Sequence, residues 1–440
     1  MHITMIGTGY VGLTSGAGLS DFGMNVICVD KDADRIKRLK DGEMVFYEPG
    51  LEELVMRNIK NGRLSFTTDL KTAVENSLVI FMAVGTPDNG RGQVDLSQIE
   101  EVAKELAEVI DDYKVLVVKS TVPVGTNRWI KQIVRAHLKK DLDVDIVSNP
   151  EFLREGSAIE DFMRPNRVVL GSDSPQALAI VKDIYRILYL IETPFILTNM
   201  ETAELIKYAS NAFLATKISF INEVANICEK VGADIHQVAK AMGLDRRIGP
   251  KFLHAGPGYG GSCFPKDTLA FEHLGRKLSS PVSIVEAAIK VNKEQRRRMV
   301  NKIEAALGSL EGKKVGILGL TFKPNTSDVR ESPAIDIIKA LLNKGARIKA
   351  YDPEGVDEFK KVVKDKNLSY FKDPYDVAKD ADALVFITEW NEFRNLDPER
   401  LKKALANPVI LDLRNIYDPD KMTELGFKYM GVGRGINPQS

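Results

Sequence analysis

One segment of the sequence places a cysteine among residues that suit covalent catalysis. Residues 256–267 read Gly-Pro-Gly-Tyr-Gly-Gly-Ser-Cys-Phe-Pro-Lys-Asp, so a glycine-rich stretch leads into Cys263 and is followed by Lys266 and Asp267. Glycine lets a chain wrap closely around a ligand. A cation near a thiol favours the thiolate, which is the reactive nucleophile. We therefore take Cys263 as a candidate nucleophile.

A second segment predicts dinucleotide binding. Gly7, Gly9 and Gly12 form a Gly-x-Gly-x-x-Gly pattern between a short apolar run and a helical stretch, and Asp30 ends the next apolar run. Such glycines allow a tight turn against a pyrophosphate at a helix N-terminus, and the acid accepts hydrogen bonds from a ribose. Asp30 would repel a 2′-phosphate, although Lys31 follows it. The pattern predicts NAD rather than NADP.

Three polar segments follow predicted strands, at the edge where open α/β sheets bind ligands. They are residues 84–87, 119–126 and 148–156. The third segment carries Glu151 and Glu155, four residues apart. Each segment taken alone also suits an ordinary turn with solvated side chains, but several at neighbouring strand ends favour a binding site.

Two residue pairs offer charge and hydrogen bonds to a site. Lys207 and Asn211 stand four residues apart in a predicted helix, so they share one face and suit stabilisation of an oxyanion. Lys323 and Arg330 lie in residues 322–332, ahead of a predicted helix, where they suit phosphate binding. Each pair taken alone also suits an ordinary protein surface.

The N-terminal elements alternate between strands and helices. Residues 2–7 and 26–30 are expected to be strands, with a helix over residues 11–22 between them. Alternation of this kind predicts a parallel sheet covered on both faces. Further strands are expected over residues 78–84, 115–119, 144–147 and 168–170, with a helix over residues 96–110.

The middle of the chain is predicted to be helical. Residues 201–231 contain no Gly or Pro and stop at Gly232, so they predict one helix about 45 Å long. Its apolar residues surround much of the circumference, which indicates packing between domains or against a second subunit. Arg296, Arg297 and Arg298 are expected to lie on a solvated helix face.

A second strand-helix-strand unit follows Lys313, with strands expected over residues 315–320 and 346–351 and a helix over residues 334–343. It repeats the N-terminal order without the phosphate-binding glycines. We therefore predict an α/β fold with two Rossmann-like, doubly wound domains joined by the long central helix. The last strands are expected over residues 383–388, 409–413 and 428–432, and the chain after Gly433 is expected to be poorly ordered.

Composition narrows the possible partners and the compartment. Lys plus Arg and Asp plus Glu number 61 each, so no net charge would hold the chain on nucleic acid or a membrane surface. Its apolar runs are too short to cross a bilayer. The three cysteines form an odd set without metal-type spacing, and no histidine cluster predicts a metal site. Cys28 and Cys228 suit core positions. A soluble protein of the cytoplasm is expected.

Taken together and in this order, these segments resemble the UDP-glucose and GDP-mannose dehydrogenase family over essentially the whole chain. The most specific match is Gly-Ser-Cys-Phe-Pro-Lys-Asp at residues 261–267. Matching segments also lie at residues 47–50 (Tyr-Glu-Pro-Gly), 119–126, 149–156 and 322–332.

The resemblance implies how the chain is divided and assembled. Residues 1–198 would form an NAD-binding Rossmann domain, and residues 199–305 a central helical region that carries the cysteine loop and a homodimer interface. Residues 306–440 would form a Rossmann-like domain that binds the UDP-sugar.

The resemblance also implies a four-electron oxidation of the sugar C6 alcohol to a carboxylate, with two NAD⁺ used in succession. Cys263 would capture the aldehyde as a thiohemiacetal, a second hydride transfer would give a thioester, and water would release the uronate. The implied roles are oxyanion stabilisation for Lys207 and Asn211, proton handling through water for Asp267 and Thr121, and activation of the hydrolytic water for Glu151.

Two wider sets of contacts follow from the resemblance. The implied cofactor contacts are Gly7, Gly9, Tyr10, Val11, Gly12, Asp30, Lys31, Gly85, Thr86, Ser120, Thr121, Glu155, Lys266 and Arg330. The implied substrate contacts are Glu151, Phe152, Leu153, Arg154, Glu155, Lys207, Asn211, Phe252, Leu253, His254, Gly256, Tyr259, Gly260, Cys263, Phe322, Lys323 and Arg414, with Arg247 reaching a neighbouring subunit's substrate.

The residues that follow the cysteine favour UDP-glucose as the sugar nucleotide. Relatives that act on N-acetylated UDP-sugars tend to follow the cysteine with Ile-Pro-Val-Asp, and GDP-mannose enzymes often have Leu in place of Phe264. His254 stands where some relatives have lysine or asparagine. The alternatives are a GDP-mannose 6-dehydrogenase, a two-electron hydroxyacid dehydrogenase, which needs no nucleophilic thiol, and a non-catalytic NAD(H)-sensing protein, which does not need Cys263.

Overall fold

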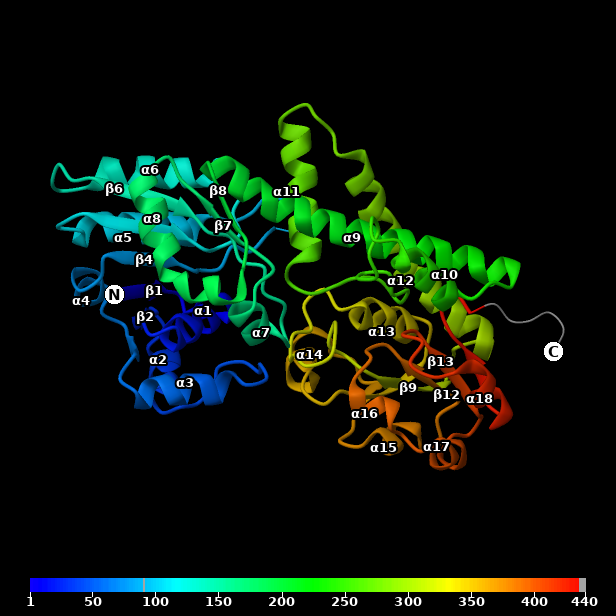
Figure 1. The fold of residues 1–440 in the computed structure, drawn as a ribbon. Coiled ribbons are helices and arrows are strands. Elements are labelled where there is room, and N and C mark those ends of the chain that lie inside the picture. The colour runs from blue at the N-terminus through cyan, green and yellow to red at the C-terminus, as the bar shows by residue number, and fades with distance from the viewer. Residues whose placement is uncertain (90–91, 435–440) are drawn as a thin grey trace. The chain divides into compact units, whose positions relative to one another are not determined.

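The computed structural model describes residues 1–89 and 92–434, which fall into two compact units, Met1–Ser210 and Asn211–Ser440. Each unit is built around one sheet covered by helices (Figure 1). Poor order was expected after Gly433, but Arg434 is placed in a β-bridge with Asp234; the rest of that expectation falls on residues 435–440, which lie outside the described residues. The division at residues 198 and 305 stays a prediction.

The first unit contains an eight-stranded sheet with the order β3-β2-β1-β4-β5-β6-β7-β8. Outward from β1 to β3 and from β4 to β6, the order is that of a dinucleotide-binding fold, with its switch point between β1 and β4. The strands are β1 (His2–Ile6), β2 (Asn25–Val29), β3 (Leu64–Thr67), β4 (Val79–Met82), β5 (Lys114–Val118), β6 (Val144–Ser148), β7 (Val168–Gly171) and β8 (Phe195–Thr198).

One pairing corrects the expectation of a wholly parallel sheet. β6 and β7 pair antiparallel through Ser148 and Gly171, whereas the other paired strands of this sheet run parallel. A parallel crossover needs a long connection that returns along the sheet. Here the only helix of the link is the six-residue α7 (Ala158–Met163), because the polar segment after β6 takes up much of the connection.

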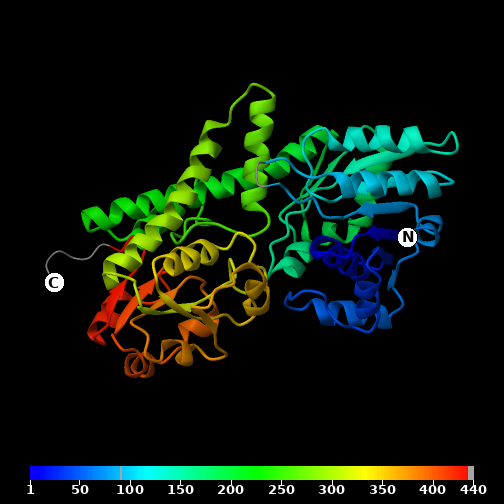
Figure 2. The same cartoon turned by 180° about the vertical axis from the view of Figure 1, so that it is seen from behind.

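Alternating side chains give the first sheet two apolar faces. Val79 and Phe81 of β4 face one core, and Ile80 and Met82 face the other. Helices α5 and α6, side by side in cyan in Figures 1 and 2, cover the second face. These two helices are Ser97–Val109 and Thr126–His137, and α4 (Leu70–Glu75) adds Val74 to the same core. The other helices of the unit are α1 (Tyr10–Asp21), α2 (Ala33–Lys40), α3 (Leu51–Lys60), α7, α8 (Pro175–Ile184) and the 3₁₀ helix η1 (Arg186–Ile191).

The long helix is confirmed as α9 (Met200–Val231). It ends where Gly232 adopts a φ of 71°, a left-handed conformation that glycine takes without strain. The boundary between the two units falls inside this helix, after Ser210.

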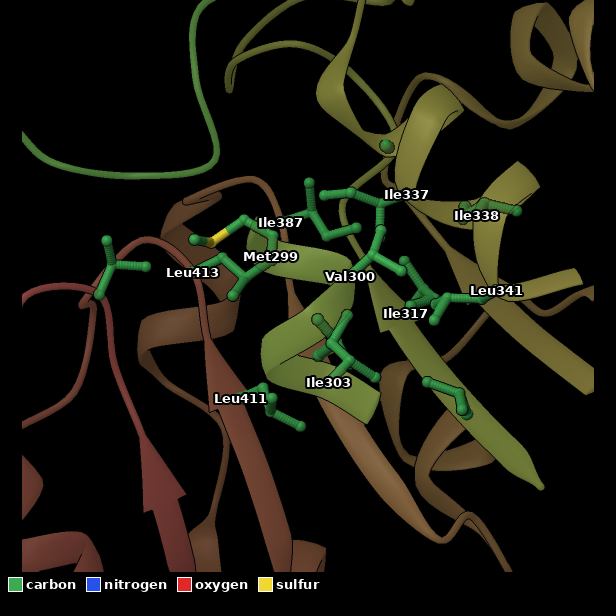
Figure 3. Close-up of a cluster of buried hydrophobic side chains, with 14 of the residues drawn as sticks. Met299, Val300, Ile303, Ile317, Ile337, Ile338, Leu341, Ile387, Leu411 and Leu413 are labelled. Atoms are coloured by element: carbon green, nitrogen blue, oxygen red, sulfur yellow. The ribbon is translucent and has the colours of Figure 1, made fainter. Parts of the chain in front are cut away.

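The second unit contains a six-stranded sheet with the order β11-β10-β9-β12-β13-β14, all parallel, which confirms the second Rossmann-like fold. Met299, Val300 and Ile303 of α12 pack with Ile317 of β9 and Ile337 of α13 on one face (Figure 3). Helices α15, α16, α17 and α18 contribute to the core on the other face. The strands are β9 (Lys314–Leu318), β10 (Arg347–Tyr351), β11 (Leu368–Tyr370), β12 (Ala383–Phe386), β13 (Val409–Asp412) and β14 (Lys428–Met430). The helices are α10 (Ile235–Leu244), α11 (Phe264–Lys277), α12 (Ser283–Leu307), α13 (Pro333–Asn343), α14 (Val356–Val362), α15 (Pro374–Ala378), α16 (Asn391–Arg394), α17 (Pro398–Ala404) and α18 (Pro419–Glu424).

Across residues 1–89 and 92–434, no helix is long and apolar enough to span a bilayer. The same residues contain no group of three or more His, Cys, Asp or Glu side chains that could hold a metal ion.

Candidate active site

The glycine turn between β1 and α1 has the shape that a dinucleotide requires. A Cβ on Gly12 would lie 1.9 Å from the carbonyl oxygen of Gly7, so only glycine allows this helix to start so close to the strand. A Cβ on Gly9 would meet no atom within 4 Å, which leaves open space beside the turn. Gly9 is the N-cap of α1 and supplies no side-chain hydrogen bond to the helix. The turn therefore offers backbone N–H groups and room for a pyrophosphate.

Asp30 sits at the end of β2, where the ribose of such a ligand is expected. Its Oδ2 accepts hydrogen bonds from Thr8 N at 2.8 Å and Thr8 Oγ1 at 2.7 Å. Burial alone would raise the pKa of Asp30, but the bonds from Thr8 and the charge of Arg35 hold it below its ordinary value. Arg35 ion-pairs with Asp30 at 3.3 Å, and Lys31 pairs with Glu101 on the surface. Asp30 is therefore an anion, which suits NAD.

Two of the polar segments meet at neighbouring strand ends, as expected. Thr86 Oγ1 donates to the carbonyl oxygen of Thr121 at 2.9 Å, and Ser120 Oγ donates to that of Val84 at 2.7 Å. These bonds join the loops after β4 and β5 into one wall beside the glycine turn. Gly85 belongs to the first of these two loops.

A buried carboxylate that the sequence did not single out supports this wall. Glu204 of α9 accepts hydrogen bonds from Gly125 N at 2.7 Å and from Asn127 N at 2.8 Å. Gly125 is the N-cap of α6 and has no side chain to cap it, so Glu204 replaces the missing cap. A glutamate in a long helix ordinarily predicts a solvated face, and no sequence signal marks this role.

Glu151 and Lys207 form a buried ion pair in the first unit. Lys207 Nζ lies 2.8 Å from Glu151 Oε1, and both side chains are at most 5% exposed. Burial would raise the pKa of Glu151, but Lys207 and the N–H of Leu153 hold it below its usual value. Phe152 packs its ring under Lys207 and under Arg167, whose guanidinium carbon lies 3.4 Å from the ring centroid. The interpretation of Glu151 as a solvated carboxylate is wrong.

A small cavity of about 50 Å³ adjoins this pair and is lined in part by Lys119, Asn149 and Tyr185. Lys119 Nζ donates to Asn149 Oδ1 at 3.2 Å and lies 3.5 Å from the hydroxyl of Tyr185. Burial lowers the pKa of Lys119 to about 8; the nearby Glu151 opposes this shift and Lys207 adds to it. A polar cavity of this size has room for ordered water.

In the second unit, Cys263 is placed as a nucleophile requires. Cys28 and Cys228 are buried, as expected, whereas Cys263 is partly exposed. Cys263 is the N-cap of α11, where the positive end of the helix dipole favours a thiolate. One turn later, the buried Asp267 accepts hydrogen bonds from Asn211 Nδ2 and Lys266 Nζ, both at 2.6 Å. The thiol, a cation and a carboxylate thus share the first turn of α11, and the amide of Asn211 reaches the carboxylate from α9.

The glycine-rich loop before Cys263 packs on the C-terminal loops that were expected to bind substrate. A Cβ on Gly260 would lie 2.2 Å from the carbonyl oxygen of Glu331, and Gly261 N donates to the carbonyl oxygen of Arg330 at 3.0 Å. Phe322 also touches this loop, since a Cβ on Gly261 would lie 2.7 Å from its ring. Residues 256–263 and 322–331 are therefore one surface.

Three residues of α12 brace this surface, and one of them contradicts the sequence analysis. Arg296 was expected on a solvated face, but it is buried and donates to the carbonyl oxygens of Tyr259 at 2.8 Å and Glu331 at 3.0 Å. Asn292 accepts from Tyr259 N, and Gln295 donates to the carbonyl oxygen of Gly256. Arg296 is buried because its guanidinium satisfies carbonyls of two loops at once, whereas Arg297 and Arg298 are exposed.

The remaining predicted contacts differ in exposure. Arg414 donates to the carbonyl oxygens of Ile387 and Phe322, so it is part of the same surface. Arg330 is exposed and pairs with Asp328, and Lys323 lies over the ring of Phe322. Arg247 and His254 are exposed, Phe252 is partly exposed, and Leu253 and Tyr259 are buried. In the first unit, Leu153, Arg154 and Glu155 directly follow Phe152. Val11 lies beside Tyr10 in the first turn of α1. The roles of all these residues stay predictions.

Comparison with known proteins places this geometry in a family. Three domains of the UDP-glucose/GDP-mannose dehydrogenase family match the chain: the NAD-binding domain at residues 1–189, the central domain at residues 201–294 and the UDP-binding domain at residues 316–419. The chain is 53% identical over 438 residues to a UDP-glucose 6-dehydrogenase of Rhizobium meliloti (strain 1021), with 99% of this chain and 100% of the relative covered. It is 46% identical to a UDP-glucose 6-dehydrogenase of Bacillus subtilis (strain 168), with coverage of 98% and 93%. The structure of a UDP-glucose dehydrogenase from Pyrobaculum islandicum matches with a TM-score of 0.91 and 38% identity, covering 98% of this chain and 97% of that one. The protein therefore belongs to the UDP-glucose/GDP-mannose dehydrogenase family of NAD-dependent enzymes.

Proposed function

We propose that this protein oxidises UDP-glucose at C6 to UDP-glucuronate, with two NAD⁺ reduced per sugar and a covalent intermediate on Cys263. The observation that carries the proposal is the setting of Cys263, the partly exposed thiol, at the N-terminus of α11 beside Asn211, Lys266 and Asp267. The full-length identity to UDP-glucose 6-dehydrogenases supports the choice of sugar nucleotide.

The first unit fits the cofactor. The turn at Gly7, Gly9 and Gly12 would hold the pyrophosphate, and Asp30 would bind the adenosine ribose. The wall of Thr86 and Ser120 would adjoin the rest of the ligand. When bound, NAD⁺ accepts the hydride in both oxidation steps.

The protein's side chains supply the proton and covalent chemistry. Asp267 and water on Thr121 would accept the C6 hydroxyl proton, while Lys207 and Asn211 would stabilise the developing oxyanion. The sulfur of Cys263 would then bond to the aldehyde carbon, and its proton would pass to the carbonyl oxygen. After the second oxidation the thioester accepts water activated by Glu151, the C–S bond breaks, and the thiol regains a proton. The net reaction consumes one alcohol, two NAD⁺ and one water and yields one carboxylate, two NADH and three protons.

Product stoichiometry tests this proposal directly. Purified protein is incubated with limiting UDP-glucose and excess NAD⁺, and NADH is followed with the sugar products; we expect two NADH and one UDP-glucuronate per UDP-glucose. A ratio of one with free aldehyde would overturn the covalent mechanism. Preferential turnover of GDP-mannose or an N-acetylated UDP-sugar in the same assay would overturn the choice of substrate.

A matched pair of cysteine variants tests the nucleophile. Cys263→Ala is expected to abolish acid formation and still bind NAD⁺, because the thiol is absent and the glycine turn is intact. Cys28→Ala is the control, since Cys28 lies in the core of the first unit and takes no part in the chemistry. Acid formation at the normal rate by Cys263→Ala contradicts the assignment.

The assembly and compartment complete the proposal. We infer a homodimer formed through α9, because Phe213, Phe220 and Ile227 of that helix are exposed in the single chain. Cys28, Cys228 and Cys263 are not joined in a disulfide, which supports a reducing compartment such as the cytoplasm. Domains at residues 1–198, 199–305 and 306–440 fit the three matched family domains.

A further inference from the structure

Glu48 is a buried carboxylate without a role in the chemistry proposed above. It belongs to the Tyr-Glu-Pro-Gly segment at residues 47–50, and its exposed fraction is 5%. A buried carboxylate is costly unless several donors satisfy it. The identity of its donors shows what Glu48 holds together.

The donors of Glu48 come from two separate binding segments. The hydroxyl of Tyr10 donates to Glu48 Oε2 at 2.5 Å, and Gly156 N donates to the same oxygen at 2.6 Å. Ala158 N donates to Glu48 Oε1 at 2.7 Å. Tyr10 lies in the glycine turn proposed for NAD⁺, whereas Gly156 and Ala158 end the segment that carries Glu151 and Glu155. One carboxylate therefore links both segments.

The link to the glycine turn is rigid on the Tyr10 side. Tyr10 is the first residue of α1 and follows Gly9 directly. Its ring packs on Phe46 with the centroids 5.1 Å apart, and its hydroxyl also approaches the carbonyl oxygen of Arg154 at 3.3 Å. Burial and the hydrogen bond to Glu48 raise the pKa of Tyr10, so the phenol stays protonated and remains a donor.

The link to the substrate segment replaces a missing helix cap. Ser157 is the N-cap of α7 but makes no side-chain cap hydrogen bond, and the carboxylate of Glu48 accepts the N–H groups on either side of it. The start of the segment is fixed elsewhere, by the pair of Glu151 and Lys207. Arg154 is held by Asp161. Glu155 thus lies between Glu151, which Lys207 fixes, and Gly156, whose N–H is held by Glu48.

We propose that Glu48 is a positioning residue that couples the cofactor turn to residues 152–158, so that each ligand orders the site of the other. The part that concerns substrate rests on the function proposed above. A dinucleotide at the turn restrains the start of α1 and with it Tyr10, whose hydroxyl shares Glu48 Oε2 with Gly156 N. Because coupling between two binding sites is reciprocal, a bound sugar nucleotide strengthens NAD⁺ binding by the same factor.

Hydrogen exchange tests the coupling without any sugar substrate. Adding NAD⁺ to the wild-type protein is expected to slow exchange of the amides of residues 152–158 about fivefold or more. Tyr10→Phe removes the phenol donor, and Glu48→Gln leaves one acceptor oxygen where two were needed; both are expected to lose the NAD⁺-dependent protection. The control is Tyr113→Phe, which removes another Tyr-to-carboxylate bond, the 2.9 Å bond to Asp145. NAD⁺-dependent protection that persists in Tyr10→Phe and Glu48→Gln overturns the proposal.

Steady-state kinetics with UDP-glucose separates coupling from a merely structural role. Tyr10→Phe and Glu48→Gln are each expected to raise KM for both substrates about tenfold, as for loss of a hydrogen bond to a charged group, with a smaller change in kcat. The double variant is expected to be no worse than the poorer single variant, because both changes break one link. The coupling is contradicted if the fold-increases in KM of the two single variants multiply in the double variant. It is also contradicted if only KM for NAD⁺ changes. Protection by NAD⁺ in a wild-type protein that does not turn over UDP-glucose would support the coupling and overturn the proposed substrate.

Discussion

Burial determines how the charged side chains around Glu151 behave. Lys207 has a carboxylate partner at 2.8 Å, whereas the hydrogen bonds of Lys119 run to the neutral side chains of Asn149 and Tyr185. An ammonium buried among neutral partners loses hydration without a matching ionic contact. Lys119 therefore has a low pKa, and its charge lowers stability while it supports the anionic form of Glu151.

The pH dependence of stability tests this interpretation of Lys119. Its pKa is about 8 in the folded protein and 10.5 as the ordinary value. Between these values the unfolded chain binds more protons, so the free energy of unfolding of the wild type rises with pH across that window. Lys119→Met lacks this gain. The difference in unfolding free energy between Lys119→Met and wild type is expected to favour the variant more below pH 8 than near pH 10, by about 2–4 kcal/mol. Denaturant titrations at both pH values measure this difference.

The hydrogen-bond network limits other effects of that substitution. Tyr185 still donates to Asn149 Oδ1 at 2.7 Å, so removing the lysine leaves no acceptor unsatisfied there. Lys114→Met serves for comparison, because Lys114 is equally buried but ion-paired with Asp112 at 2.6 Å. A difference in unfolding free energy between wild type and Lys119→Met that stays constant from pH 7 to pH 10 would disprove the interpretation.

At the level of elements, α12 works as a brace for the cysteine loop. Arg296→Met removes the donor shared by the carbonyl oxygens of Tyr259 and Glu331. Leaving such buried groups unpaired is expected to cost about 1–3 kcal/mol of unfolding free energy and, by loosening the loop, to lower kcat. Arg297→Met is the matched control, since Arg297 is exposed and its loss is expected to stay within about 0.5 kcal/mol. Equal melting temperatures and equal kcat for the two variants would refute the role of Arg296.

The sequence predicted the elements better than the contacts between them. Strand and helix patterns are local, so α1, α9 and the second Rossmann-like unit were placed correctly. The role proposed for Cys263 likewise rests on its own neighbours in sequence. Glu48 and Glu204 were assigned no role, and Arg296 was wrongly expected on the surface. Each is a charged residue whose partners lie at least 35 residues away, and pattern alone assigns such residues to the surface.

The short strands and strained loops were missed for related reasons. β3, β8 and β11 lie at the edges of their sheets and are only partly buried, so they lack the continuous apolar run that marks a central strand. Phe252 and Glu331 adopt positive φ angles of 65° and 51°, which non-glycine residues rarely do and which tertiary contacts must impose. Both residues lie in the loops of the candidate site.

At the level of the whole molecule, two Rossmann-like units do not make two dinucleotide sites. Asp352 ends β10 as Asp30 ends β2, and it accepts hydrogen bonds from Thr321 as Asp30 does from Thr8. In the second unit, however, Trp390 Nε1 also donates to Asp352 at 3.2 Å, and the acid is 2% exposed. Its carboxylate is thus occupied within the protein.

One NAD⁺ per chain is the expected consequence. Calorimetric titration should give a stoichiometry of one, because the acid of the second unit cannot reach a ribose. Asp30→Asn is expected to weaken binding about tenfold, by loss of charge-assisted hydrogen bonds. Asp352→Asn is expected to lower stability and leave NAD⁺ affinity unchanged. Two equivalent sites per chain, or equal weakening by both variants, would show that the second unit also binds the cofactor.

Helix α9 carries apolar side chains that the single chain leaves exposed, and we expect a second copy to cover them. Phe213, Phe220 and Ile227 are 66%, 49% and 59% exposed and recur every seven residues, so they form one apolar stripe along α9. Phe220→Glu puts a charge in the middle of that stripe and is expected to convert the proposed dimer to a monomer in sedimentation equilibrium. Leu278→Glu is the control, because Leu278 is 65% exposed but lies after α11 rather than on α9. A Phe220→Glu protein with the same sedimentation behaviour as wild type would exclude the stripe as the interface, since a glutamate buried in an apolar interface is strongly disfavoured.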